Sequence, residues 1–270
     1  MQKIDLEEIY FRFTNLYKDR PYLSLWRSCE ALSILNCLKE FERLSDLNTK
    51  SGFNLDIGCG DGRTAKGLDL NFSVGLDTDL ISVREAKDIG QYEYVIVGDA
   101  THLPVKPWSV NFALSNCVFE HIESIEDAIN DLSNSLCKSS LFIITMPTKN
   151  LLSDILFLMP LSLFGIYNNS EVHINRSLRH YHYFDNNVLR MFNRVGFRFV
   201  SSSYYMPSKL VSWWLFLRYS ERLFQRLNLI YLWRIISCIV ERINYSLIKG
   251  SLKCKKAGGG ITIALMKNGG

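Results

Sequence analysis

The stretch that constrains this chain most is Phe53–Gly62, where a short apolar segment runs into a turn that holds three glycines within five residues. Glycine allows positive φ angles and leaves room above the main chain, so such a turn can be tight and a ligand can approach its backbone closely. A helix is predicted to begin just after the turn, near Arg63, and its first N–H groups lack partners within the helix. The stretch therefore predicts a strand, a ligand-binding turn and a helix, in that order.

The turn differs from the dinucleotide-binding fingerprint G-x-G-x-x-G, because that pattern requires its third glycine at the position of Arg63. Asp56 precedes the turn and Asp61 lies within it. Carboxylates at these positions repel an anionic pyrophosphate and favour a ligand with a cationic amino-acid tail. A nicotinamide oxidoreductase is therefore disfavoured.

The pattern D-x-G-x-G-x-G over residues 56–62 resembles motif I of the class I S-adenosylmethionine-dependent methyltransferases. The resemblance implies that S-adenosylmethionine is the cofactor and that Asp56, Gly58, Cys59 and Gly60 lie around it. A glycine-rich turn on its own is equally compatible with a purely structural role, so the interpretation depends on the segments that follow.

An acid ends the second predicted strand, which covers Phe72–Asp77. A carboxylate in this place can accept hydrogen bonds from both hydroxyls of an adenosine ribose. Asp77 is therefore predicted to bind the ribose, and Thr78 beside it is included in the predicted cofactor site. Asp79 is a weaker candidate for the same role.

Two further segments resemble the methyltransferases. Residues 98–104, G-D-A-T-H-L-P, match the family's third signature, which implies that Asp99 accepts from the adenine amine and that the Ala100 N–H faces the ring. Residues 116–122, N-C-V-F-E-H-I, resemble the segment that lines the sulfonium end of the cofactor. Asn116 is therefore assigned to the cofactor site as well.

Predicted strands and helices alternate from residue 53 to residue 147, which indicates an α/β fold with a doubly wound, mostly parallel sheet. The resemblance implies a seven-stranded, Rossmann-like methyltransferase sheet. In that sheet the last strand, at about 260–267, pairs antiparallel with the strand at about 197–204 and lies beside the strand at 141–147. Ligands of such sheets bind at the carboxyl ends of the strands, where the motifs above fall.

The chain is predicted to have four parts. Residues 1–50 form N-terminal helices, at 3–18 and 23–44, which the resemblance places over the cofactor site; they can equally only pack on the sheet, and Trp26, Arg27 and Glu30 are weak candidates for reaching a ligand. Residues 51–206 form the methyltransferase core with a cap at 148–180. Residues 207–258 form a helical insertion, and residues 259–270 complete the sheet. The apolar run at 151–167 contains Asp154 and Pro160, so it is predicted to cap the site rather than to span a membrane.

The cysteines and the N-terminal residues favour a cytoplasmic location. The net charge of +4 does not by itself indicate a nucleic-acid partner. The seven cysteines include no C-x-x-C pair and no zinc-type spacing, so reduced thiols and no metal site are expected. The first residues are polar and lack the apolar core of a signal peptide.

The motifs together predict a methyltransferase that moves the methyl group of S-adenosylmethionine in line to an oxygen or nitrogen of a small-molecule, sugar or lipid-linked acceptor. The alternative is a non-catalytic protein of the same fold that binds S-adenosylmethionine. Nucleic-acid bases are disfavoured as acceptors, because the Asn/Asp-Pro-Pro-aromatic stretch of enzymes that methylate them has no counterpart at 116–119.

His180, in the run R-H-Y-H-Y-F-D at 179–185, is the predicted general base or acceptor-orienting group, and His121 is the alternative. Histidine titrates near neutral pH and suits a hydroxyl acceptor. A histidine among tyrosines can equally cap a helix or satisfy a buried carbonyl group.

Residues 207–256 carry ten basic residues and only two acids, and tryptophans and leucines lie among them. Arg218, Arg222 and Arg226 recur every four residues, so one helix is predicted to carry a basic stripe. Such a face suits the headgroup region of anionic lipid. The alternatives are packing within the protein or a homodimer contact, with arginine stems covering apolar surface. The predicted location is therefore cytoplasmic, at the membrane surface in the first case.

Overall fold

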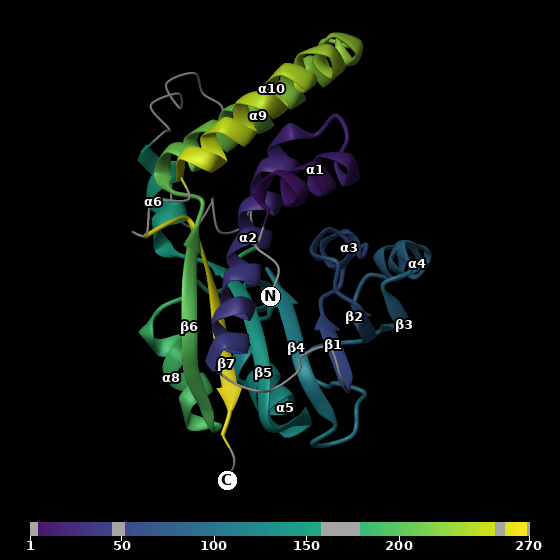
Figure 1. The fold of residues 1–270 in the computed structure, drawn as a ribbon, viewed down its shortest axis with the longest axis vertical. Helices are drawn as coiled ribbons and strands as arrows, with labels where there is room; N and C mark the ends of the chain where they lie inside the picture. The colour runs from purple at the N-terminus through teal and green to yellow at the C-terminus, as the bar shows by residue number, and fades with distance from the viewer. Residues whose placement is uncertain (1–4, 45–51, 158–178, 252–256, 269–270) are drawn as a thin grey trace.

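A computed structural model describes residues 5–44, 52–157, 179–251 and 257–268 (Figure 1). They form a seven-stranded sheet of order β3-β2-β1-β4-β5-β7-β6, in which β7 is antiparallel to both of its neighbours. The strands are β1 (Phe53–Ile57), β2 (Phe72–Asp77), β3 (Tyr92–Val97), β4 (Val110–Asn116), β5 (Leu136–Pro147), β6 (Phe197–Tyr205) and β7 (Gly260–Lys267). The predicted doubly wound, mostly parallel sheet, with the last strand beside the fifth, is confirmed.

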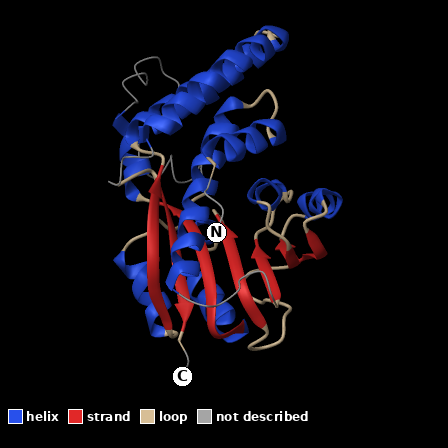
Figure 2. Ribbon diagram, viewed as in Figure 1, coloured by secondary structure: helices blue, strands red, loops and turns tan. Residues whose placement is uncertain are grey.

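Helices cover both faces of the sheet (Figure 2). They are α1 (Leu6–Leu16), α2 (Pro21–Leu44), α3 (Arg63–Leu68), α4 (Leu80–Ile89), the short 3-10 helix η1 (Phe119–His121), α5 (Ile125–Ser135), α6 (Lys149–Phe157), α8 (Asn186–Arg194), α9 (Ser208–Arg226) and α10 (Ile230–Ser251). Alternate residues of β5 point to opposite faces of the sheet: Ile143 belongs to the buried cluster that includes residues of α1 and α2, and Ile144 to the cluster that includes residues of α5 and α8. This alternation explains why central strands of the sheet read as continuous apolar runs.

Some element boundaries differ from the sequence prediction. The second helix begins at Pro21 rather than at residue 23, because proline fits the first position of a helix, where its missing N–H is not needed. β5 begins at Leu136 rather than at 141, because α5 ends at Ser135 and leads directly into a residue that pairs with Val110 of β4. The predicted cap at 148–180 begins with α6, and residues 158–178 of it lie outside the described residues.

The predicted helical insertion consists of α9 and α10, residues 208–251, here called the α9–α10 hairpin. β6 runs parallel to β5, since both are antiparallel to β7, so α9 begins at the edge where the parallel strands end. Figure 1 shows the hairpin extending beyond that edge of the sheet. α10 is held to the N-terminal helices: the Trp233 indole N–H donates to the Asp19 carbonyl at 3.1 Å, and the Asn244 amide donates to the Pro21 carbonyl at 3.0 Å. Among the described residues, no helix is long and apolar enough to cross a bilayer.

Candidate active site

The glycine turn joins β1 to α3 and is tied to the end of β2. The Gly60 N–H donates to one carboxylate oxygen of Asp77 at 2.8 Å, and the Asp79 N–H donates to the other at 2.9 Å. Gly58 has a φ of +71°, and a Cβ there would lie 2.1 Å from a methyl carbon of Val118, so only glycine fits. The turn, Asp77 and the segment after β4 thus meet at the carboxyl edge of the sheet.

The surface above Gly60 is open, since a Cβ added there would meet no atom within 4 Å. The Asp77 carboxylate is half-buried, and Thr78 and Asp99 are exposed. One Asp99 oxygen accepts from the Thr101 N–H and hydroxyl, both at 2.8 Å, and these bonds hold the pKa of Asp99 below its ordinary value. Asp99 is therefore an ionised acceptor at neutral pH, and the N–H of the buried Ala100 follows it in the chain.

Asp56 occupies a different position from the other predicted acids. It is only 3% exposed, and its carboxylate accepts from the Tyr92 hydroxyl at 2.8 Å. Burial raises the pKa of Asp56 to about 7, although the Tyr92 bond opposes the rise. The Cys59 side chain is buried as well. These two side chains lie beneath the turn, whereas Asp79 caps α4 through the Ser82 N–H at 2.9 Å.

A buried carboxylate on α2, Glu30, links the N-terminal helices to the end of β4. It is 1% exposed and accepts from Arg27 at 2.5 Å, from the Asn116 amide at 2.9 Å, and from three other donors: the Cys117 thiol, the Tyr205 hydroxyl and the Trp26 indole. Burial opposes ionisation, but Arg27 and the hydrogen bonds outweigh it and hold the pKa of Glu30 below its ordinary value. Asn116 is therefore anchored by Glu30 on one side and, through its carbonyl, by the Thr145 hydroxyl at 2.7 Å on the other.

The two predicted catalytic histidines lie together. The ring centroids of His121 and His180 are 5.1 Å apart, and one atom of each ring lies within 4.8 Å of a carboxylate oxygen of Glu120. Burial, assisted by His121, lowers the pKa of His180 to about 4, so His180 is neutral at pH 7. Burial also raises the pKa of Glu120, which is 2% exposed, to about 8. The cluster therefore offers the neutral imidazole of His180 as a group that can bind or orient a ligand.

Residues 55–144 match the sequence model of a family described as a methyltransferase domain. They are a class I S-adenosylmethionine-dependent methyltransferase domain. No curated protein matches the chain in sequence.

Solved structures of methyltransferases share the fold at low sequence identity. A methyltransferase from Thermotoga maritima aligns with a TM-score of 0.52 at 18% identity, over 96% of this chain and 99% of that one. The phosphoethanolamine N-methyltransferase 2 of Haemonchus contortus, solved with S-adenosylmethionine, gives 0.53 at 18%, over 87% of this chain and 52% of that one. The geranyl diphosphate C-methyltransferase of Streptomyces coelicolor, solved with S-adenosylhomocysteine, gives 0.51 at 13%, over 85% and 78%.

S-adenosylmethionine is the cofactor of this methyltransferase, and the residues at the carboxyl edge fit it. The open surface above Gly60 gives the cofactor access to the main chain. Asp77 and Asp99 offer anionic acceptors to hydroxyl and amine donors of a nucleoside. These contacts stay predictions, as do those of Asp56, Cys59 and Asn116, whose side chains already bond or pack within the protein.

Sequence reasoning did not single out Glu120 or Tyr205 of the candidate site, and it named Glu30 only as a weak candidate for reaching a ligand. Glu30 and Tyr205 lie far apart in the chain, on α2 and at the end of β6, and their hydroxyl–carboxylate contact of 3.2 Å exists only once the sheet has formed. Glu120 stands in the N-C-V-F-E-H-I segment but was read only as part of that motif. Glu120 could have been recognised as a candidate site residue because it is an acid among apolar residues, and buried carboxylates are rare without a role.

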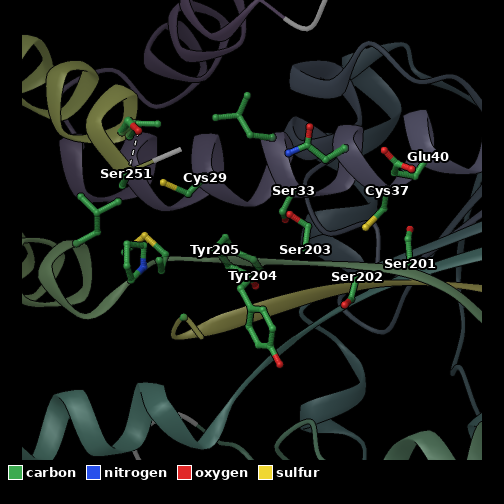
Figure 3. A pocket seen from close by; sticks show the side chains of 17 residues that line it. Cys29, Ser33, Cys37, Glu40, Ser201, Ser202, Ser203, Tyr204, Tyr205 and Ser251 are labelled. Atoms are coloured by element: carbon green, nitrogen blue, oxygen red, sulfur yellow. Dashed lines mark hydrogen bonds between the residues drawn. The ribbon is translucent and has the colours of Figure 1, made fainter. Parts of the chain in front are cut away.

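A cavity of about 590 Å³ lies between α2 and β6 (Figure 3). Cys29, Ser33 and Cys37 of α2 face the serines of β6 across it, and Tyr205 lines its end nearest Glu30. None of the predicted site residues lines this cavity. It therefore runs along the face of the sheet and is separate from the predicted cofactor site.

Proposed function

We propose that this methyltransferase transfers the methyl group to an oxygen or nitrogen of a small-molecule, sugar or lipid-linked acceptor, which it meets at a membrane surface. The observation that carries the transfer is the position of the His121–His180 pair. His121 lies in η1, shortly after the end of β4, and His180 packs against it, so the pair lies at the same edge of the sheet as the glycine turn and Asp77.

The reaction is a single in-line displacement. The acceptor oxygen or nitrogen forms a bond to the methyl carbon while the carbon–sulfur bond breaks, its electron pair stays on sulfur, and S-adenosylhomocysteine leaves. A hydroxyl acceptor must also give up its proton. Such reactions are accelerated mainly by positioning and by excluding water from the cation. His180, or else His121, orients the acceptor or takes its proton, which suits a neutral imidazole.

The outward face of the α9–α10 hairpin supports the membrane part of the proposal. Exposed apolar side chains recur every four residues along α10, and α9 adds others near its end. They are Tyr231, Leu232, Ile235, Ile239, Ile243 and Leu247 of α10, and Phe216, Tyr219, Leu223 and Leu227 of α9 and its C-cap. This outer apolar face is the kind of exposed hydrophobic surface that marks an interaction site.

The charges of the hairpin favour an anionic partner. Its two acids point inward: Glu221 is 5% exposed and lies 3.7 Å from the Arg20 guanidinium, and Glu241 accepts from the Ser24 hydroxyl at 2.8 Å. Its basic residues remain outside, exposed except for half-buried Arg218; they are Lys209, Arg218, Arg222, Arg226, Arg234, Arg242 and Lys249. Arg234 pairs with the Asp19 carboxylate at 3.1 Å. An apolar face flanked by the remaining cations complements the anionic headgroups of a bilayer.

The first half of α9 is connected to the candidate active site through side-chain contacts. Trp214 of α9 packs against Trp26 with ring centroids 4.9 Å apart, and the Trp26 indole donates to Glu30 at 3.2 Å. A hairpin that lies on lipid would therefore hold the carboxyl edge of the sheet close to the bilayer. An acceptor with a lipid anchor could then reach the site without leaving the membrane.

The methyl transfer is tested with S-adenosylmethionine that carries a tritiated methyl group, supplied with a chloroform–methanol lipid extract, an aqueous metabolite fraction and a protein fraction. We expect label in the lipid extract. Label in the aqueous fraction alone would keep the methyltransferase but remove the membrane acceptor. Calorimetric binding of S-adenosylmethionine without label in any fraction would favour the alternative, a non-catalytic binding protein of the same fold.

Lipid binding gives a separate prediction. The wild-type protein is expected to sediment with phosphatidylserine-containing vesicles and to stay in the supernatant with pure phosphatidylcholine. The double variant Arg222→Glu/Arg226→Glu should lose at least tenfold in vesicle partitioning, since each basic residue near an anionic surface contributes about 1 kcal/mol. Arg218 is left intact because it lies over the Trp214 ring, 5.4 Å from its centroid.

The matched control is Arg190→Glu/Arg194→Glu, which makes the same charge change at two exposed arginines of α8, away from the hairpin. This variant should sediment like the wild type. Wild-type protein that stays in the supernatant at low salt would remove the membrane from the proposal. So would a stable dimer that dissociates when Ile235 and Ile239 are changed to aspartate, because the outer apolar face would then be a contact between two copies.

A further inference from the structure

Three side chains beside the candidate site have the composition of a metal-ion site. Glu120 and His121 belong to η1, and His180 comes from the segment that precedes α8. One ligand atom of each lies within 4.8 Å of those of the other two. A carboxylate and two imidazoles form a common ligand set for divalent first-row cations such as Zn²⁺, Mn²⁺ and Fe²⁺.

Two of these side chains have polar atoms with no partner inside the described part of the protein. One carboxylate oxygen of Glu120 and Nδ1 of His180 are buried and make no hydrogen bond there. Leaving a buried polar atom unsatisfied costs about 1–3 kcal/mol, so such atoms in a folded protein call for an explanation. A cation bound between them would satisfy both.

The third side chain is already oriented as metal-binding histidines are. Nδ1 of His121 lies 2.8 Å from the Arg179 carbonyl, and only a ring N–H at Nδ1 can make that bond. The proton is thereby fixed on Nδ1, which leaves the Nε2 lone pair free. Histidines that bind metals usually donate their other ring N–H to a carbonyl or carboxylate in this way.

Main-chain bonds hold the segment that carries His180 against η1. The Tyr181 N–H donates to the Glu120 carbonyl at 2.7 Å, and the His182 N–H reaches the same carbonyl at 3.3 Å. Phe184 is fixed next to them by its N–H bond of 2.9 Å to the Pro147 carbonyl. The backbone thus brings the three side chains together, with their ligand atoms within 4.8 Å of one another.

We propose that Glu120, His121 and His180 bind a divalent cation that coordinates the acceptor oxygen. This inference rests on the proposed methyl transfer and gives it a substrate class, a hydroxyl acceptor rather than an amine. With both imidazoles acting as ligands, the histidines orient the acceptor through the ion and do not take its proton. A bound cation lowers the pKa of a coordinated hydroxyl, so the proton passes to water and the oxygen attacks the methyl carbon as an alkoxide. Three protein ligands leave coordination positions open for that oxygen.

Metal binding is measured directly, on protein stripped with EDTA and dialysed. Calorimetric titration with Zn²⁺ and the visible absorption of added Co²⁺ are expected to report one site in the wild type. Glu120→Gln, His121→Ala and His180→Ala should each weaken that site at least tenfold. His121 is exposed, so its replacement tests the site even if the variant at buried Glu120 fails to fold.

The matched control is His182→Ala, which removes a neighbouring histidine whose Nε2 lies 3.2 Å from the Glu123 carbonyl and which belongs to no such cluster. It should bind the metal like the wild type. Wild-type protein that binds neither ion, or binding unchanged in His121→Ala and His180→Ala, would overturn the proposal.

Activity separates failure of the metal site from failure of the methyl transfer. Methyl transfer that survives EDTA treatment unchanged would reject the cation and keep the methyltransferase. Metal binding at these residues in a protein that methylates no acceptor would keep the site and reject the transfer. Loss of activity in EDTA that Zn²⁺ or Mn²⁺ restores in the wild type, but not in His180→Ala, would support both.

Discussion

Replacing Glu30 with alanine is expected to lower the free energy of unfolding by about 3–5 kcal/mol, the range measured when one partner of a buried ion pair is removed. The side chain accepts hydrogen bonds from five residues, of which Tyr205 is 4% exposed. Without Glu30, the donors of Asn116, Cys117 and Tyr205 lose their acceptor, and Arg27 loses its counter-charge. Urea unfolding followed by circular dichroism measures the change.

Glu40→Ala is a closely matched control. Glu40 lies on the same helix and pairs with Arg43 at the same spacing at which Glu30 pairs with Arg27, but its side chain is 47% exposed. A surface pair of this kind contributes about 0.5 kcal/mol or less. Glu30→Gln, which keeps one acceptor oxygen and the volume, should fall between the two. Equal losses in Glu30→Ala and Glu40→Ala would show that the buried cluster contributes nothing to stability.

The fold was predictable because its signals are local. Three short apolar runs each ended in an acid or a glycine turn, and this pattern locates β1, β2 and β3 within two residues. The glycine turn predicted a close approach to the main chain, but not that the group approaching Gly58 is the side chain of Val118. Boundaries were less accurate where one element leads directly into the next, as at Leu136.

The side-chain contacts of the site were not predictable in the same way. Asp56 and Asp77 look alike in the sequence, as acids near glycines at the end of apolar runs. In the fold, Asp56 is covered by Tyr92, whereas Asp77 lies at the turn with both oxygens accepting main-chain N–H groups. Which acid is buried depends on which face of its strand the side chain occupies and on what packs there. A single sequence holds that information only through residues distant in the chain.

The positions of the two acids in the α9–α10 hairpin also depend on residues that are distant in the chain. The sequence predicts a basic stripe in a segment with two acids, but it does not show on which side those acids lie. Only the packing of α10 on α1 and α2 shows that Glu241 faces Ser24 and Tyr10 and leaves the outside cationic. Charge counting alone therefore underestimates how strongly one face of this hairpin differs from the other.

Asp77→Ala is expected to weaken S-adenosylmethionine binding by about 1.5–3 kcal/mol, which is roughly a ten- to hundredfold loss in affinity. The reason is that the ionised carboxylate is predicted to accept hydrogen bonds from both ribose hydroxyls, and bonds to a charged group are the stronger kind. The variant also frees the N–H groups of Gly60 and Asp79 at the turn. Isothermal titration calorimetry on folded protein measures the affinity.

Two further variants distinguish a direct contact between Asp77 and the ribose from a general effect of removing a negative charge. Asp88→Ala removes an exposed acid near the far end of α4 and should leave the affinity unchanged, because a solvated charge at a distance is screened by salt. Asp77→Asn retains one acceptor oxygen without the charge and should lose less affinity than Asp77→Ala. If Asp77→Ala binds as tightly as Asp88→Ala, Asp77 does not contact the ribose, and its role is confined to holding the glycine turn through the Gly60 N–H.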